Sequence, residues 1–128
     1  MAIVLMVAAF AACGESTAKV KVIDIKLTNE EYAFGVDKNQ PELLEQVNTF
    51  IKEIKEAGTF KEICDKYFAG GTPTPVESAQ EDPTKDQLVV ATNAAFEPFE
   101  YMDGDKCIGI VMEFAAALAE KLGKELEI

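Results

Sequence analysis

The hydrophobic residues between positions 41 and 68 recur three and four places apart, the spacing of one helix face. Pro41 begins the first predicted helix, because a missing N–H costs little there, and Gly58 ends it. Thr59 begins a second helix. The positions predicted to face a core are Leu43, Leu44, Val47, Phe50, Ile51 and Ile54 in the first helix, and Phe60, Ile63, Cys64, Tyr67 and Phe68 in the second. Two such helices must pack on a sheet or on each other.

Three further segments have the composition of strands. Leu88–Val90 is a short apolar run bounded by polar residues, which is typical of a strand buried on both faces. Val20–Leu27 is rich in Val and Ile, and Tyr32–Val36 is a shorter candidate. After the polar turn Met102–Lys106, a third helix is predicted from apolar residues at helical spacing, namely Val111, Phe114, Ala115, Leu118 and Leu122.

The loop that follows the strand Leu88–Val90 carries the candidate ligand-binding residues. Open α/β sheets bind ligands just past the carboxyl ends of their strands. Asn93 offers an amide there, and Phe96 and Phe99 offer aromatic faces. For Phe96, ligand contact and capping of the sheet edge fit equally, whereas packing is favoured for Phe99 and Tyr101.

Gly70–Asp86 is predicted to be a linker. It contains three prolines and several small polar residues and has no apolar periodicity. Such a segment has nothing to bury, so we expect it to be mobile or extended.

The length and net charge of the chain limit the number of domains and the kinds of binding partner that we expect. A length of 128 residues suits one ordinary domain. The net charge of -11 argues against nucleic acid and against an anionic membrane surface as partners. The chain contains no arginine, histidine or tryptophan, so all of its basic side chains are lysines.

Two stretches resemble one known family. LVVATNAAFEPFEYMDGDKCIGI, followed by a helix ending in ALAEKLGKELEI, resembles the opening of bacterial extracellular solute-binding proteins of the polar amino-acid class, which serve ABC transporters. IDIKLTNEEYAFGVDKNQPELLEQVNTFIKEIKEAGTFKEICDKYF is similar to the closing segment of the same family. The order is inverted, as in a circular permutation or a junction between tandem copies.

The resemblance implies a fold and a division of the chain. The expected fold is α/β: a three-layer, flavodoxin-like lobe of the periplasmic-binding-protein type, with a mainly parallel sheet and helices on both faces. The chain is too short for two lobes, so residues 1–128 are expected to form one. In that lobe, residues 1–69 resemble the family's C-terminal segment, residues 70–86 form the linker, and residues 87–128 resemble its N-terminal segment.

The implied function is non-catalytic binding of a small polar amino acid, with an ABC transporter permease as partner if the protein is natural. A zwitterion needs a cation for its carboxylate and an anion for its ammonium group. The family uses an arginine and an aspartate. This chain has no arginine, and Met6 stands at the place of the aspartate if residues 1–6 align with the corresponding strand. Val111 likewise stands where the family commonly has an aspartate, at the start of the helix. The clamp is therefore expected to be incomplete, with ligand affinity weak or lost.

The apolar start Met1–Cys13 has two interpretations. It is either the apolar part of a lipoprotein signal, with Cys13 as the lipidation site, or a buried strand of the lobe; the strand is favoured, since no basic residues precede the run. It is too short to span a bilayer as a helix. The family implies a periplasmic or extracellular, membrane-anchored location, whereas an engineered chain would be cytoplasmic.

We expect no enzyme, cofactor or metal site. Some relatives with this fold are cyclohexadienyl dehydratases, but this chain lacks histidine and arginine, and Glu97 and Glu100 are expected to be solvated. The spacing of Cys13, Cys64 and Cys107 fits no metal motif, and a Cys64–Cys107 disulfide remains open. The alternative function is a rearranged or engineered scaffold lobe without ligand, which forms a homodimer by exchanging segments.

Overall fold

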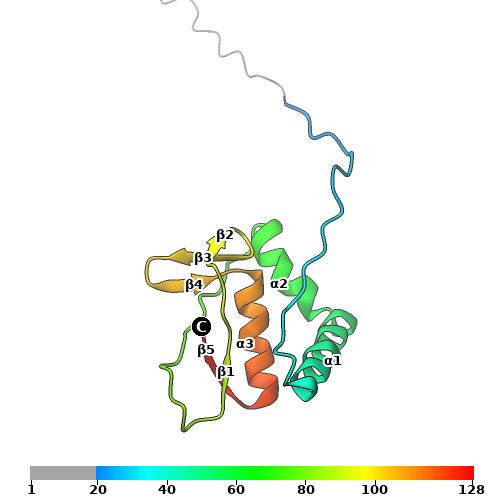
Figure 1. Cartoon of the computed structure of the whole chain (residues 1–128). Coiled ribbons are helices and arrows are strands. Elements are labelled where there is room, and N and C mark those ends of the chain that lie inside the picture. Colours follow the sequence, from blue (N-terminus) through cyan, green and yellow to red (C-terminus); the bar gives the residue numbers. More distant parts are fainter. Residues whose placement is uncertain (1–19) are drawn as a thin grey trace, which may run out of the picture. The chain divides into compact units, whose positions relative to one another are not determined.

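The computed structural model describes residues 20–128 of the chain (Figure 1). The chain divides after Phe34, and the unit Gly35–Ile128 holds the helices and strands of the described residues. The two interpretations of Met1–Cys13, including lipidation of Cys13, lie outside the described residues.

The three predicted helices are confirmed. They are α1 (Pro41–Ala57), α2 (Thr59–Phe68) and α3 (Ile110–Leu122). Gly58 separates the first two with a φ of 85°, a left-handed conformation that glycine adopts without steric cost. Pro41 is the first helical residue, as predicted.

Five short strands form two sheets. In the first sheet, β1 (Gln87–Val89) pairs in parallel with β5 (Glu125–Glu127), and Leu88 lies opposite Leu126. In the second, β2 (Ala95–Phe96), β3 (Glu100–Asp103) and β4 (Lys106–Ile108) form an antiparallel meander. The α/β class is confirmed. The expectation of a mainly parallel sheet is wrong for the described residues, because the loop after β1 pairs with its own continuation instead of remaining irregular.

Helix α3 is the central element of the core. It contacts α2, the hairpin strands β3 and β4, and β5 (Figure 1). Met112 is fully buried, and the ring of Phe114 meets that of Phe50 edge to face, with centroids 5.3 Å apart. The pairing therefore joins α1, from the first half of the chain, to α3, from the second.

The linker 70–86 is extended, but it is not devoid of buried groups, which corrects the sequence prediction. Val76 is 7% exposed and forms an isolated bridge with Cys107 of β4, with its N–H 2.9 Å from the Cys107 carbonyl oxygen. The N–H of Ala79 donates to the carbonyl oxygen of Leu126 in β5 at 2.7 Å. One isolated valine between prolines has no periodicity, so pattern analysis missed it.

The two strand predictions for Val20–Leu27 and Tyr32–Val36 are wrong. Neither segment belongs to a strand, and residues 20–34 are all exposed. A β-branched composition favours an extended backbone, but a strand also needs a neighbour that accepts its hydrogen bonds.

Candidate functional site

The three candidate ligand-binding residues lie on or beside the β2–β3 turn. Phe96 is 50% exposed and stacks on Phe99 with ring centroids 5.4 Å apart and an interplanar angle of 18°. Phe99 is half-buried, and Asn93 is exposed. The structure thus brings Phe96 and Phe99 together as one aromatic surface, while Asn93 lies two residues before β2 on the same loop.

The start of α3 holds this aromatic turn in place. The N–H groups of Ile110 and Val111 donate to the carbonyl oxygens of Pro98 and Phe99, at 3.1 and 2.9 Å. The first N–H groups of a helix have no partners within the helix, so these carbonyls satisfy them. Gly109 makes the approach feasible: a Cβ at this position would lie 2.1 Å from the Phe99 carbonyl oxygen.

A third ring comes from the other half of the chain. Phe68, the last residue of α2, meets Phe99 edge to face with centroids 6.5 Å apart. Phe68 is 65% exposed, so the prediction that it packs into the core is wrong. We call Phe68, Phe96 and Phe99 the aromatic platform. Phe68 lies 28 positions before Phe96 in the sequence, and helical periodicity predicted it only as a packing residue.

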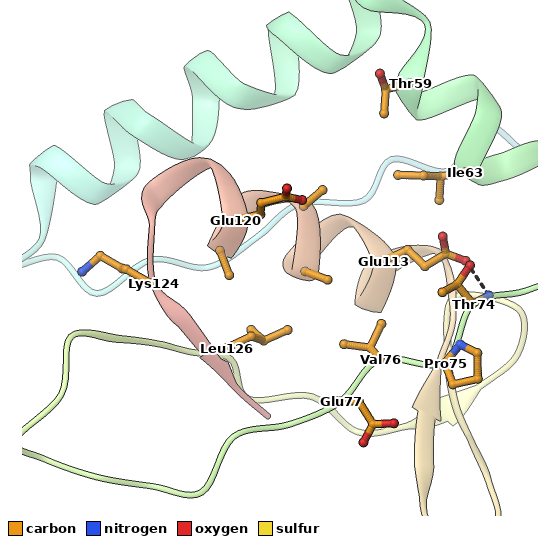
Figure 2. Close-up of a pocket in the computed structure, with 13 residues that line it drawn as sticks. Thr59, Ile63, Thr74, Pro75, Val76, Glu77, Glu113, Glu120, Lys124 and Leu126 are labelled. Carbon is orange, nitrogen blue, oxygen red and sulfur yellow. Dashed lines mark hydrogen bonds between the residues drawn. The ribbon is translucent and has the colours of Figure 1, made fainter.

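A buried carboxylate, that of Glu113 in α3, is hydrogen-bonded to Tyr67, the residue before Phe68. It is 7% exposed and accepts a hydrogen bond from the Tyr67 hydroxyl at 2.8 Å. It also accepts one from the Thr74 backbone N–H at 3.0 Å (Figure 2). Lys66 forms an ion pair with it. A buried charge is costly unless it is paired and hydrogen-bonded, and Glu113 meets both conditions.

Tyr67 connects Glu113 to the start of α3. Its hydroxyl donates to Glu113 and accepts the Gly109 N–H at 3.1 Å. Burial raises the pKa of the Tyr67 hydroxyl, and the hydrogen bond to Glu113 and its charge raise it further. The tyrosine therefore stays neutral and keeps donating its proton well above neutral pH.

Two pockets flank this region. One, of about 520 Å³, lies between α2, the linker and α3 and is lined by Ile63, Val76, Glu113 and Lys124 among others (Figure 2). The other, of about 480 Å³, lies past the carboxyl ends of β1 and β5, where Thr92 and Ile128 line it. Asn93, Phe96 and Phe99 line neither, so the aromatic platform is a surface rather than a cavity.

Three lysines of this unit, Lys66, Lys106 and Lys124, are paired with acids. Lys106, which lines the pocket past the strand ends, lies 2.5 Å from Glu77, and that hydrogen bond raises the pKa of the Lys106 ammonium group. Lys66 pairs with Glu113, and Lys124 pairs with Asp86. These three ammonium groups already have carboxylate partners, so none offers a ready replacement for a carboxylate-binding arginine.

The described residues contain no group of three or more histidines, cysteines, aspartates and glutamates arranged to hold a metal ion. Cys64 and Cys107 are both free thiols, so the disulfide left open by the sequence is not formed. Cys107 is buried, whereas Cys64 is only partly so. Among residues 20–128, no helix has the length and apolar character needed to cross a bilayer.

Comparison with known proteins identifies the family. The model of bacterial extracellular solute-binding proteins, family 3, matches residues 4–70, which is just over half of the 128 residues. The chain therefore belongs to this family, and the resemblance seen in the sequence is confirmed.

One relative is the arginine-binding extracellular protein ArtP of Bacillus subtilis (strain 168). It is 46% identical to this chain over 44 residues, which are 34% of this chain but only 17% of ArtP. The match thus spans a small part of the relative's length. No solved structure matches the chain.

Sequence reasoning missed Glu113, Tyr67 and Phe68 as members of the site. Tyr67 and Phe68 were predicted only as core positions, and Glu113 was assigned no role. The signal that could have found it is its position: it lies between Met112 and Phe114, both buried. A carboxylate at the centre of an apolar stripe predicts a buried partner.

Proposed function

We propose that this chain is a non-catalytic amino-acid-binding lobe related to ABC importer binding proteins, with an incomplete ligand clamp. The family of extracellular solute-binding proteins supports the binding role and a periplasmic or extracellular location. The chain lacks arginine, and Lys66, Lys106 and Lys124 are paired with acids. A ligand carboxylate would therefore find neither a guanidinium group nor a free ammonium group among these three lysines, which supports weak binding.

The observation that carries the proposal is the half-exposed ring of Phe96, stacked on Phe99 in a turn fixed by α3. A flat aromatic face attracts a cation or a planar group. Glu97, which is exposed beside Phe96, adds negative charge. With a relative described as arginine-binding, these features favour a cationic amino acid whose guanidinium lies on Phe96, with Asn93 as a hydrogen-bonding group.

The division of the chain supports the same proposal. Residues 1–69 correspond to the family's closing segment and residues 87–128 to its opening segment, joined by the linker 70–86. The contacts of α3 with α1 and α2 support a shared interior for residues 35–128.

The test is titration of L-arginine into the full chain, followed by NMR shift changes or calorimetry. We expect saturable binding with a dissociation constant on the order of 1 mM. L-Citrulline, which has the same shape without the charge, should bind more weakly. Phe96→Ala should abolish binding, whereas Met102→Ala, in the pocket past the strand ends, should not. Equal binding of arginine and citrulline would contradict a cationic ligand.

The second candidate is a rearranged or engineered scaffold lobe without ligand. The exposed apolar side chains of Val20–Leu27 favour it, since an exposed apolar segment can pair with a second copy. Size-exclusion with light scattering separates the candidates. A dimer mass without any ligand-induced rise in melting temperature supports the scaffold.

A further inference from the structure

The aromatic platform is built by both halves of the chain. Phe96 and Phe99 follow β1, whereas Phe68 ends α2, 31 positions before Phe99 in the sequence. Phe99 lies between the other two, stacked on Phe96 and edge to face with Phe68. The position of α2 therefore determines whether the platform has two rings or three.

The end of α2 is fixed by hydrogen bonds to α3. Tyr67, next to Phe68, donates to Glu113 at 2.8 Å and accepts from Gly109 N–H at 3.1 Å. Gly109 is also the residue that packs against the Phe99 carbonyl, since a Cβ there would lie 2.1 Å from it. One hydroxyl thus ties together α2, the start of α3 and the backbone of the aromatic turn.

We propose that α2 completes the ligand surface: Phe68 contributes its third aromatic wall, and Tyr67 is the residue that positions it. This inference rests on the proposed ligand surface and extends it to a residue outside the loop. The exposed ring of Phe68 suits contact with a planar cation that lies on Phe96, because both rings border Phe99. Helix α2 is consequently a binding element as well as a packing one.

The test uses the full chain, with Phe68→Leu and Tyr67→Phe as variants and Phe60→Leu as the matched control. Phe60 lies in the first turn of α2, at the end of the helix away from Phe68. Without ligand, Phe68→Leu and Tyr67→Phe should shift the NMR amide signals of the aromatic turn (residues 95–97 and 99; Pro98 has no N–H), and Phe60→Leu should leave them in place. Phe68→Leu removes an exposed side chain, so it should fold normally.

Titration with L-arginine gives the second readout. Phe68→Leu and Tyr67→Phe should each weaken binding roughly two- to five-fold, the range of an exposed cation–aromatic contact. If the wild type binds no arginine but the signals of residues 95–99 still shift, the proposed function fails and the positioning role stands. The inference would be overturned if neither variant shifted these amide signals. It would also be overturned if the wild type bound arginine and both variants bound it with the same affinity.

Discussion

The hydroxyl of Tyr67 donates a 2.8 Å hydrogen bond to the carboxylate of Glu113, which lies 46 positions further along the chain. Tyr67 lies in α2 and Glu113 in α3, so the bond joins these two helices within the unit Gly35–Ile128. Tyr67 also directly precedes Phe68 of the aromatic platform, so this contact links the stability of the unit to the geometry of the candidate site.

Tyr67→Phe should lower the free energy of unfolding by about 1–3 kcal/mol, because it leaves a buried carboxylate with one donor fewer and the Gly109 N–H without its acceptor. Urea unfolding followed by circular dichroism measures the change. Tyr32→Phe is the matched control: its hydroxyl donates to Glu30 in an exposed segment, and its loss should cost less than about 0.5 kcal/mol. Equal effects of the two variants would contradict a special role for Tyr67.

The same tyrosine predicts a dependence of stability on alkaline pH. The pKa of Tyr67 is raised in the folded protein, first by burial and then by Glu113, so the folded state holds this proton more tightly than the unfolded state. The stabilisation is complete below the unfolded pKa, about 10, and is lost as pH rises above it. Unfolding measured at about pH 8 and pH 11 should show a larger loss for the wild type than for Tyr67→Phe. The titration of Tyr101 is common to both and cancels.

Local sequence patterns were sufficient to predict the helices. The predictions that were wrong concerned features that depend on contacts between residues distant in the sequence. Helical spacing and Pro41 and Gly58 located α1 and α2 correctly, since these signals act within a few residues. Val20–Leu27 has strand composition, but whether a strand forms depends on a neighbour that composition does not specify. Phe96 and Phe99 could be selected from their loop, whereas Phe68 could not, because only the packing of α2 on α3 brings it to Phe99.

Gly109→Ala should destabilise the protein by at least ~3 kcal/mol and displace the aromatic turn. The residue has a φ of 141°, which side chains rarely adopt, and a Cβ would overlap the carbonyl group of Phe99. Gly104→Ala is the control: its φ of 64° is also positive, but nothing lies within 4 Å of its Cβ, so the cost should be about 1 kcal/mol. Thermal unfolding compares the two. Similar losses of stability in the two variants would show that the aromatic turn can move to accommodate a side chain at position 109, and would contradict the prediction.

The thiols of Cys64 and Cys107 should react slowly with iodoacetamide in the folded protein. Burial is the largest cause that raises the pKa of each thiol above its ordinary value, which lowers the fraction of the reactive thiolate near neutral pH. Peptide mass spectrometry should show faster labelling of both in urea, and a larger acceleration at the buried Cys107 than at the partly exposed Cys64. Labelling of folded Cys107 at its unfolded rate would contradict its burial.

Val76→Ala should lower the free energy of unfolding by about 2 kcal/mol, since it removes two buried methyl groups from the contact between the linker and β4. Val89→Ala is the matched control, because that valine is 65% exposed in β1 and its truncation should cost less than about 0.5 kcal/mol. Hydrogen exchange provides an independent check: the amides of Val76 and Ala79, bonded to Cys107 and Leu126, should exchange slowly. A freely mobile linker would give rapid exchange at both amides and equal, small effects of the two substitutions.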